Sequence, residues 1–192
     1  MKNMKISVGV SSHHVHLKEE DLKTLFGNDY NLSKLRDLKQ PDEFASTETV
    51  TLKTEKGIIK NVRILGPCRK YTQVEISKTD AYLLGIDPPV RKSGDILSSS
   101  PITIIGPSGV VVLKEGCIIS ERHIHLTEKH LKEYNLENKD HVNVLIPGSK
   151  GGILFNVKLK VSRNAYFELH LDTDCANAFS LKNGDIVDII EE

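Results

Sequence analysis

The sequence contains no tryptophan, has only 5% aromatic residues and has three cysteines. The low aromatic content argues against a base-stacking surface, which depends on exposed aromatic side chains. Cys68, Cys117 and Cys175 are odd in number and far apart, so they predict neither a disulfide framework nor a cysteine zinc finger. The longest apolar run, at residues 110–113, is far shorter than the roughly 20 residues of a membrane span.

An excess of charge of one sign is also missing. The 26 Lys and Arg residues balance 26 Asp and Glu residues, whereas nucleic-acid-binding domains are usually strongly basic. No signal-peptide apolar region follows the first residues, and no glycine-rich phosphate loop, Gly-x-Ser-x-Gly or His-Glu-x-x-His motif occurs. We therefore expect a cytoplasmic protein with no nucleic-acid or membrane partner and without ATP, NAD or serine-hydrolase chemistry.

Short β-branched runs bounded by turn residues predict a mainly β protein. Hairpins are expected at 47–65, 102–113 and 142–161. Further strands are expected at 6–10, 73–77, 117–119, 167–171 and 186–190. Helical spacing is brief, at 17–26, 81–84 and 126–134. This mixture favours small barrels or sandwiches over a parallel α/β sheet.

Residues 11–23 and 120–132 resemble each other, with seven of thirteen positions identical at an offset of 109 residues. Chance resemblance between two amphipathic segments is the alternative. We predict two interleaved β-barrel domains related by this repeat, with the active site between them. The predicted domains are 1–45 with 114–192, which joins the N-terminal strand to the C-terminal half, and the central barrel 46–113.

Each copy of the repeat contains a His-x-His sequence. In a strand, residues i and i+2 face the same side, so two imidazoles can converge on one cation while the residue between them packs on the other side. His14 and His16 form one such pair, and His123 and His125 form the other. Imidazole is a preferred ligand of zinc, so the repeated pairs predict two metal sites.

The third ligand of each site is predicted from the repeat. His170 lies in an alternating strand of the second half, and Glu75 occupies the corresponding strand of the first half. Without the repeat, a solvated strand carboxylate and a hydrogen-bonded histidine would be the simpler interpretations. Arg69 follows a turn that leads into the Glu75 strand, and its guanidinium suits phosphate or a developing oxyanion. Cys68 is interpreted as a small hydrophobic residue.

Four motifs together carry a family resemblance. They are Ser-His-His-Val-His-Leu at 12–17, Gly-Pro-Cys-Arg-Lys-Tyr-Thr-Gln-Val-Glu at 66–75, Arg-His-Ile-His-Leu at 122–126 and Glu-Leu-His-Leu-Asp-Thr-Asp at 168–174. The sequence resembles the PduL-type phosphate propanoyltransferases over nearly its whole length. The family pattern has arginine where this chain has His13.

The resemblance implies two interleaved barrels, a di-zinc site and reversible transfer of a short acyl group, acetyl or propanoyl, between coenzyme A and phosphate. It implies that one zinc is held by His123, His125 and His170, and the other by His14, His16 and Glu75, with Arg69 as the catalytic, anion-stabilising residue. The expected partners are acyl-CoA and phosphate, and a homodimer is expected. Since His14 comes so early, no microcompartment-targeting extension is expected.

Two other interpretations remain open at this point. His14, His16 and Glu20 match part of a cupin-like pattern, although residues 17–26 favour a helix where a cupin has strands. The chain would then be another kind of metal-dependent barrel enzyme. The second alternative is a non-catalytic, zinc-stabilised binding module, although structural zinc sites usually have four protein ligands and often include cysteine.

Overall fold

The computed structural model describes residues 4–190, which form two compact units. One unit comprises the chain up to Ser11 together with the chain from Glu121 onward, and the other comprises Ser12–Ser120. The N-terminal strand therefore lies with the C-terminal half. The division differs from the predicted boundaries at residues 45 and 114, because the first His-x-His strand and the helix after it belong to the central unit.

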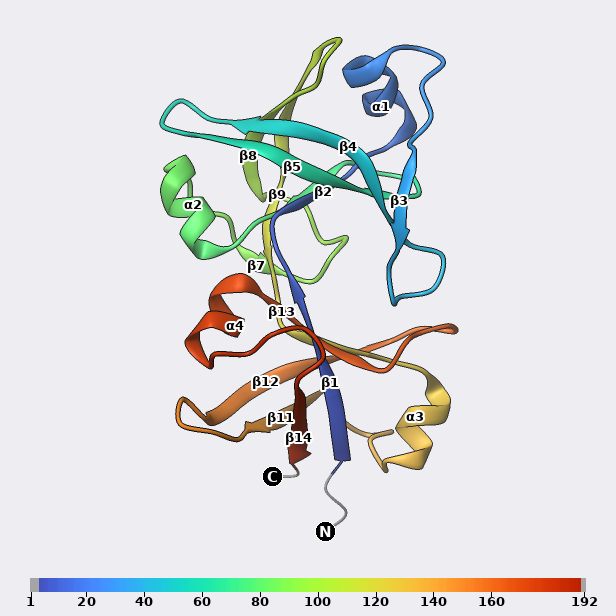
Figure 1. Cartoon of the computed structure of the whole chain (residues 1–192), viewed down its shortest axis with the longest axis vertical. Coiled ribbons are helices and arrows are strands. Elements are labelled where there is room, and N and C mark those ends of the chain that lie inside the picture. Colours follow the sequence, from blue (N-terminus) through green and yellow to red (C-terminus); the bar gives the residue numbers. More distant parts are fainter. Residues whose placement is uncertain (1–3, 191–192) are drawn as a thin grey trace. The chain divides into compact units, whose positions relative to one another are not determined.

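The unit that contains the C-terminal half is a closed six-stranded barrel with the order β1-β13-β10-β12-β11-β14. Its strands are β1 (Met4–Ser11), β10 (His123–Leu126), β11 (His141–Ile146), β12 (Gly152–Val161), β13 (Glu168–Asp172) and β14 (Ile186–Ile190). Figure 1 shows β1, in blue, among the orange and red strands of this unit. Strand β1 pairs in parallel with β13 and antiparallel with β14, so the first strand of the chain closes a barrel built by its last residues.

The central unit is also a closed barrel. Its strands are β2 (His14–His16), β3 (Lys34–Asp37), β4 (Phe44–Lys53), β5 (Ile58–Gly66), β6 (Gln73–Glu75), β7 (Val90–Arg91), β8 (Ser100–Ile105) and β9 (Val110–Ser120). The sheet order is β3-β4-β5-β2-β6-β9-β7, and β8 pairs with both β4 and β9. Strand β8 thus closes the six-stranded ring β4-β5-β2-β6-β9-β8, while β3 and β7 extend it at the sides.

The two barrels share one topology, which explains the sequence repeat. Strand β10 pairs in parallel with β12 and antiparallel with β13, and β2 pairs in the same two ways with β5 and β6. In each barrel, the strand that carries the predicted third ligand also has a parallel neighbour. This neighbour is β9 beside β6 in the central barrel and β1 beside β13 in the other barrel. The predicted fold, mainly β with two barrels, is confirmed.

Four short helices occur among the described residues: α1 (Glu19–Phe26), α2 (Lys78–Leu84), α3 (Glu128–Glu133) and α4 (Thr173–Ala178). Helix α2 begins with a capping box between Ser77 and Asp80, and α4 begins where the Asp172 side chain accepts from the Cys175 backbone N–H. None of the described helices is both long enough and apolar enough to cross a membrane. Helix α4 was not predicted, since six residues are too few to show helical periodicity.

Each barrel has its own core of branched aliphatic side chains. Val15 and Ile124, the residues between the paired histidines, are completely buried in their respective cores. Burial of one face of a strand fixes its register, because a slip of one residue would bring polar side chains inward. The core packing of Val15 and Ile124 therefore directs both histidines of each pair to the opposite face of the strand.

Strand β9 is longer than predicted. The sequence predicted separate strands at 110–113 and 117–119, but one strand runs from Val110 to Ser120 and includes Gly116. Gly116 has a φ of 139°, a conformation that side chains with a Cβ rarely adopt. The glycine therefore allows the strand to continue past a point where the sequence indicated an interruption.

Candidate metal centres

The central barrel brings His14, His16 and Glu75 together. His14 lies directly across from Glu75 in the antiparallel pair of β2 and β6, and all three side chains are buried. The His14 Nε2 atom is 3.6 Å from Glu75 Oε2, and the His16 Nε2 atom is 4.0 Å from Glu75 Oε1. The three predicted residues therefore form one group whose ligand atoms face one another.

The imidazoles of this group are prepared for ligation by their surroundings. The Nδ1 atom of His14 is 2.9 Å from the backbone carbonyl oxygen of Ser12 and can donate its proton there, which places the lone pair of the ring on Nε2. Burial, with smaller contributions from His14 and the positive charge of Arg69, holds the pKa of His16 well below its ordinary value. A neutral imidazole is the form that binds a metal ion.

The C-terminal barrel brings together His123, His125 and His170 in the same way. His123 pairs across the strands with His170, and the ring centroids of the three residues are 4.5 to 5.4 Å apart. The Nδ1 atom of His123 lies 2.8 Å from the Glu121 carbonyl oxygen, which repeats the contact between His14 and Ser12. The second predicted triad therefore exists as a group of three partly buried imidazoles.

Both triads fit a small divalent cation. Within each group, one ligand atom from every residue lies within 4.8 Å of the other two. The Nε2 atoms of His123 and His125 are 3.0 Å apart, close to the roughly 3.3 Å expected for two nitrogen ligands of a tetrahedral zinc ion. Each triad offers three potential ligands, a number that would leave a coordination position for an exogenous group, as in catalytic zinc sites.

Arg69 belongs to a hydrogen-bond network of the central barrel. Its Nη2 atom donates to Glu43 Oε1 at 2.8 Å, and its Nη1 atom donates to Ser93 Oγ at 3.2 Å. Ser93 in turn accepts from Gln73 Nε2 at 2.9 Å, and the same nitrogen donates to Glu75 Oε1 at 2.6 Å. The guanidinium is therefore connected to the carboxylate of the triad through two intervening side chains.

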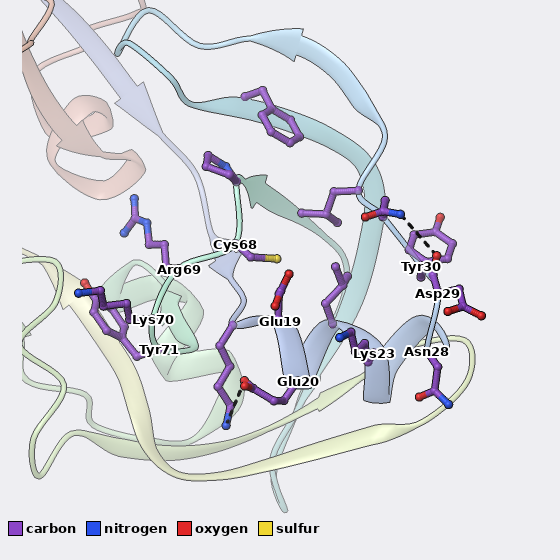
Figure 2. Close-up of a pocket in the computed structure, with 16 residues that line it drawn as sticks. Glu19, Glu20, Lys23, Asn28, Asp29, Tyr30, Cys68, Arg69, Lys70 and Tyr71 are labelled. Atoms are coloured by element: carbon purple, nitrogen blue, oxygen red, sulfur yellow. Dashed lines mark hydrogen bonds and ion pairs between the residues drawn. The ribbon is translucent and has the colours of Figure 1, made fainter.

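A groove of about 1180 Å³ lies beside this network on the central barrel, between α1 and residues 67–71. Figure 2 shows the Cys68 sulfur directed toward Glu19 across the groove, while the Arg69 guanidinium is directed away from α1. Burial and then the charge of Glu19 raise the pKa of the Cys68 thiol. A thiol with a raised pKa is a poor nucleophile at neutral pH, which agrees with its interpretation as a small hydrophobic residue.

Four residues around the triads were not predicted from the sequence to have a role: Glu43, Gln73, Ser93 and Glu168. A signal was present for two of them, since Gln73 and Glu168 stand two residues before Glu75 and His170 and so share their strand face. Glu43 and Ser93 carried no such signal. Glu20, which suggested a cupin-like site, lies in α1 with an exposed carboxylate 3.9 Å from Lys18 Nζ, and it is not part of the triad.

His13 contacts Asp80, whereas His14 and His16 face Glu75. Its Nδ1 atom lies 3.2 Å from Asp80 Oδ2, and Asp80 also closes the capping box of α2. The hydrogen bond to Asp80 outweighs partial burial and raises the pKa of His13. His13 therefore connects the start of β2 to the N-terminus of α2.

The family model described as phosphate propanoyltransferase matches residues 7–182, a range that includes both triads and Arg69. The chain belongs to the phosphate propanoyltransferase family. Because members of this family transfer acyl groups, the chain is an acyltransferase enzyme, and the non-catalytic and cupin-like alternatives are not supported.

Three curated phosphate propanoyltransferases illustrate the similarity. The protein of Thermotoga maritima is 49% identical over 97% of this chain and 89% of its own length. The Rhodopseudomonas palustris protein is 43% identical over 97% and 83%, and the Salmonella typhimurium protein is 40% identical over 95% and 87%. The similarity to phosphate propanoyltransferases therefore extends across both barrels.

Proposed function

We propose that the chain converts a short-chain acyl-CoA, acetyl- or propanoyl-CoA, and phosphate to an acyl phosphate and coenzyme A, with one zinc ion in each triad. In this reaction a phosphate oxygen attacks the thioester carbonyl, the C–S bond breaks, and the sulfur leaves as a thiolate that takes up a proton. The reverse direction uses the same groups. The observation that carries the proposal is the recurrence of one three-ligand geometry in both barrels of a member of this family.

The two triads differ in ligand character, which suggests different roles. The three imidazoles of His123, His125 and His170 form a borderline set that suits a thiolate. The set with the Glu75 carboxylate is harder and suits phosphate oxygens. Bound zinc would supply Lewis-acid stabilisation of the negative charge that develops on sulfur and oxygen.

Arg69 is assigned to the anionic reactant. A guanidinium presents its N–H donors in a planar fork that matches two phosphate oxygens or the developing oxyanion. Its bonds to Glu43 and Ser93 fix its direction before the reactant binds, so little reorganisation is needed during the reaction. Direct attack by phosphate is favoured over an acyl-enzyme, because burial raises the pKa of Cys117 to about 12 and that of Cys175 to about 11.

The experiment that tests this function is a coenzyme A release assay with acetyl-, propanoyl- and butanoyl-CoA, with and without phosphate. Release of coenzyme A should require phosphate. Sulfate has a similar shape but is a much weaker nucleophile, so it should not replace phosphate. Equally fast release without phosphate would identify a thioesterase instead. Elemental analysis of gently purified protein should find two divalent ions per chain, and protein without stoichiometric metal would refute the zinc assignment.

A further inference from the structure

A buried polar side chain lies beside each triad at equivalent positions of the two barrels. Gln73 pairs across the strands with His16, and Glu168 pairs with His125. Each stands two residues before the third ligand on the same strand, and their exposed fractions are 0% and 3%. A polar group this deeply buried is costly unless it is hydrogen-bonded, so the partners of these two side chains indicate why they are there.

Gln73 is held in one orientation. Its Oε1 atom accepts from the Gly94 backbone N–H at 2.7 Å, so the amide nitrogen must be the end that faces Glu75 and Ser93. That nitrogen donates to Glu75 Oε1 at 2.6 Å. The carboxylate ligand of the central barrel is therefore met by a donor whose direction is fixed by the backbone.

Glu168 presents the opposite hydrogen-bonding character. Its Oε2 atom lies 2.9 Å from His170 Nε2, and as a carboxylate it accepts the proton of that ring nitrogen. A carboxylate can only accept, so this contact favours the tautomer of His170 that carries its proton on Nε2, in which Nδ1 is the nitrogen left to bind a metal ion. The imidazole ligand of the C-terminal barrel is therefore met by an acceptor.

Strand β1 is shaped around this contact. Gly9 lies opposite His170 in the parallel pair of β1 and β13. A Cβ atom at Gly9 would approach Glu168 Oε2 to 2.6 Å and His170 Cδ2 to 2.9 Å, closer than ordinary contacts allow. The glycine therefore leaves the space in which the carboxylate and the imidazole meet.

From these contacts we propose that Gln73 and Glu168 are positioning residues, each matched to its neighbouring third ligand: a donor for Glu75 and an acceptor for His170. The inference rests on the proposed function, in which the triads hold zinc. Hydrogen-bond partners of metal ligands fix ligand direction and tautomer and typically change metal affinity 10- to 100-fold when removed. The matching also explains why the two barrels differ at this position in spite of their common topology.

The test is the rate at which each zinc ion passes to a chromogenic chelator. Gln73→Met and Glu168→Met keep side-chain length but remove the polar contact. We expect each to release the ion of its own barrel about 10- to 100-fold faster, while the other ion leaves at the wild-type rate. Glu168→Gln keeps an oxygen that can accept from His170, so it should recover most of the wild-type behaviour.

A matched control substitution is available in the central barrel. Glu48 is also a buried carboxylate, and it accepts hydrogen bonds from Tyr30, Ser33 and Thr47. Glu48→Gln should lower thermal stability without a change in either zinc release rate. If Glu48→Gln accelerated zinc release as much as Glu168→Met, the effect would reflect general loosening and the inference would be wrong.

Two gentler variants decide the matter where a Met variant does not fold. Gly9→Ala adds a methyl group that must displace the Glu168 carboxylate, so it should loosen the C-terminal ion although Glu168 is retained. Gln73→Asn keeps the amide but shortens it, so it should loosen the central ion. If these variants released zinc at the wild-type rate, the positioning roles of Gln73 and Glu168 would be wrong, but the metal sites would stand. If the unmodified protein bound no zinc, the proposed metal sites would be wrong as well.

Discussion

Replacement of Arg69 by alanine gives the sharpest test of the proposed chemistry. The Arg69 fork makes two directed side-chain contacts, to Glu43 at 2.8 Å and to Ser93 at 3.2 Å, and is therefore preorganised. Loss of one preorganised donor to an oxyanion costs about 100- to 1000-fold in turnover, or about 2.7–4 kcal/mol. We expect kcat for Arg69→Ala to fall by this factor. The kcat of Arg69→Lys should fall less, because lysine keeps the positive charge but lacks the planar guanidinium fork.

The substitution should leave the rest of the protein intact. The ion pair with Glu43 is partly exposed, with exposed side-chain fractions of 25% and 33%. Solvent-accessible ion pairs contribute about 0–1 kcal/mol to the free energy of unfolding, so Arg69→Ala should remain folded. Neither triad includes Arg69, so the zinc content should also be unchanged.

Steady-state rates, elemental analysis and thermal unfolding of the same preparation test these expectations together. Lys34→Ala is a suitable control, since Lys34 belongs to an exposed ion pair with Asp37 in the same barrel and should retain wild-type turnover. A folded, metal-replete Arg69→Ala protein with a near wild-type rate would remove Arg69 from the mechanism.

Three further predictions concern one metal centre and the stability of each barrel. His170→Ala should retain the zinc of the central barrel and lose that of the C-terminal barrel in elemental analysis; retention of both ions would contradict the ligand assignment. Ile124→Ala, which removes a completely buried side chain, should lower the free energy of unfolding of metal-free protein by about 2–5 kcal/mol in urea titrations, and a change below about 1 kcal/mol would contradict the core packing. Burial alone would raise the pKa of Glu48, but hydrogen bonds from backbone N–H groups of Glu48 and Ser33 and hydroxyls of Tyr30 and Thr47 lower it. The ionised Glu48 carboxylate therefore stabilises the folded protein above its unfolded-state pKa near 4.5, and this stabilisation is lost as the pH falls through the lower folded-state pKa. On acidification, the wild-type protein should therefore lose more free energy of unfolding than Glu48→Gln.

The paired histidines could be predicted from the sequence because their geometry is local. Alternation along a strand places His14 with His16, and His123 with His125, on one face, whatever the rest of the chain does. The intervening Val15 and Ile124 indicated which face is buried, and both are completely buried. The repeat then extended the prediction to Glu75 and His170, since each copy is followed by a hairpin and then by a strand that carries one more candidate ligand.

The extent of each barrel depended on pairings between distant residues. Strand β1 joins β13 and β14 more than 150 residues later in the chain, and β2 joins β5 and β6 instead of continuing the barrel of β1. The break at Ser11–Ser12 therefore divides one N-terminal segment between two barrels. No local pattern of residues marks such a break, because it follows from which strands complete each closed sheet.

The sequence by itself determined the chemistry that is available: two His-x-His pairs, a candidate third ligand for each pair, and an arginine near one of these candidates. Only the tertiary structure decided how these groups are oriented. The contacts of Arg69 with Glu43 and Ser93 join residues 26 and 24 positions apart in the chain, and Gly9 faces Glu168 and His170 from another strand. Hydrogen bonds and close approaches of this kind depend on strand register and barrel closure, which are set by packing of the whole domain and not by residue spacing.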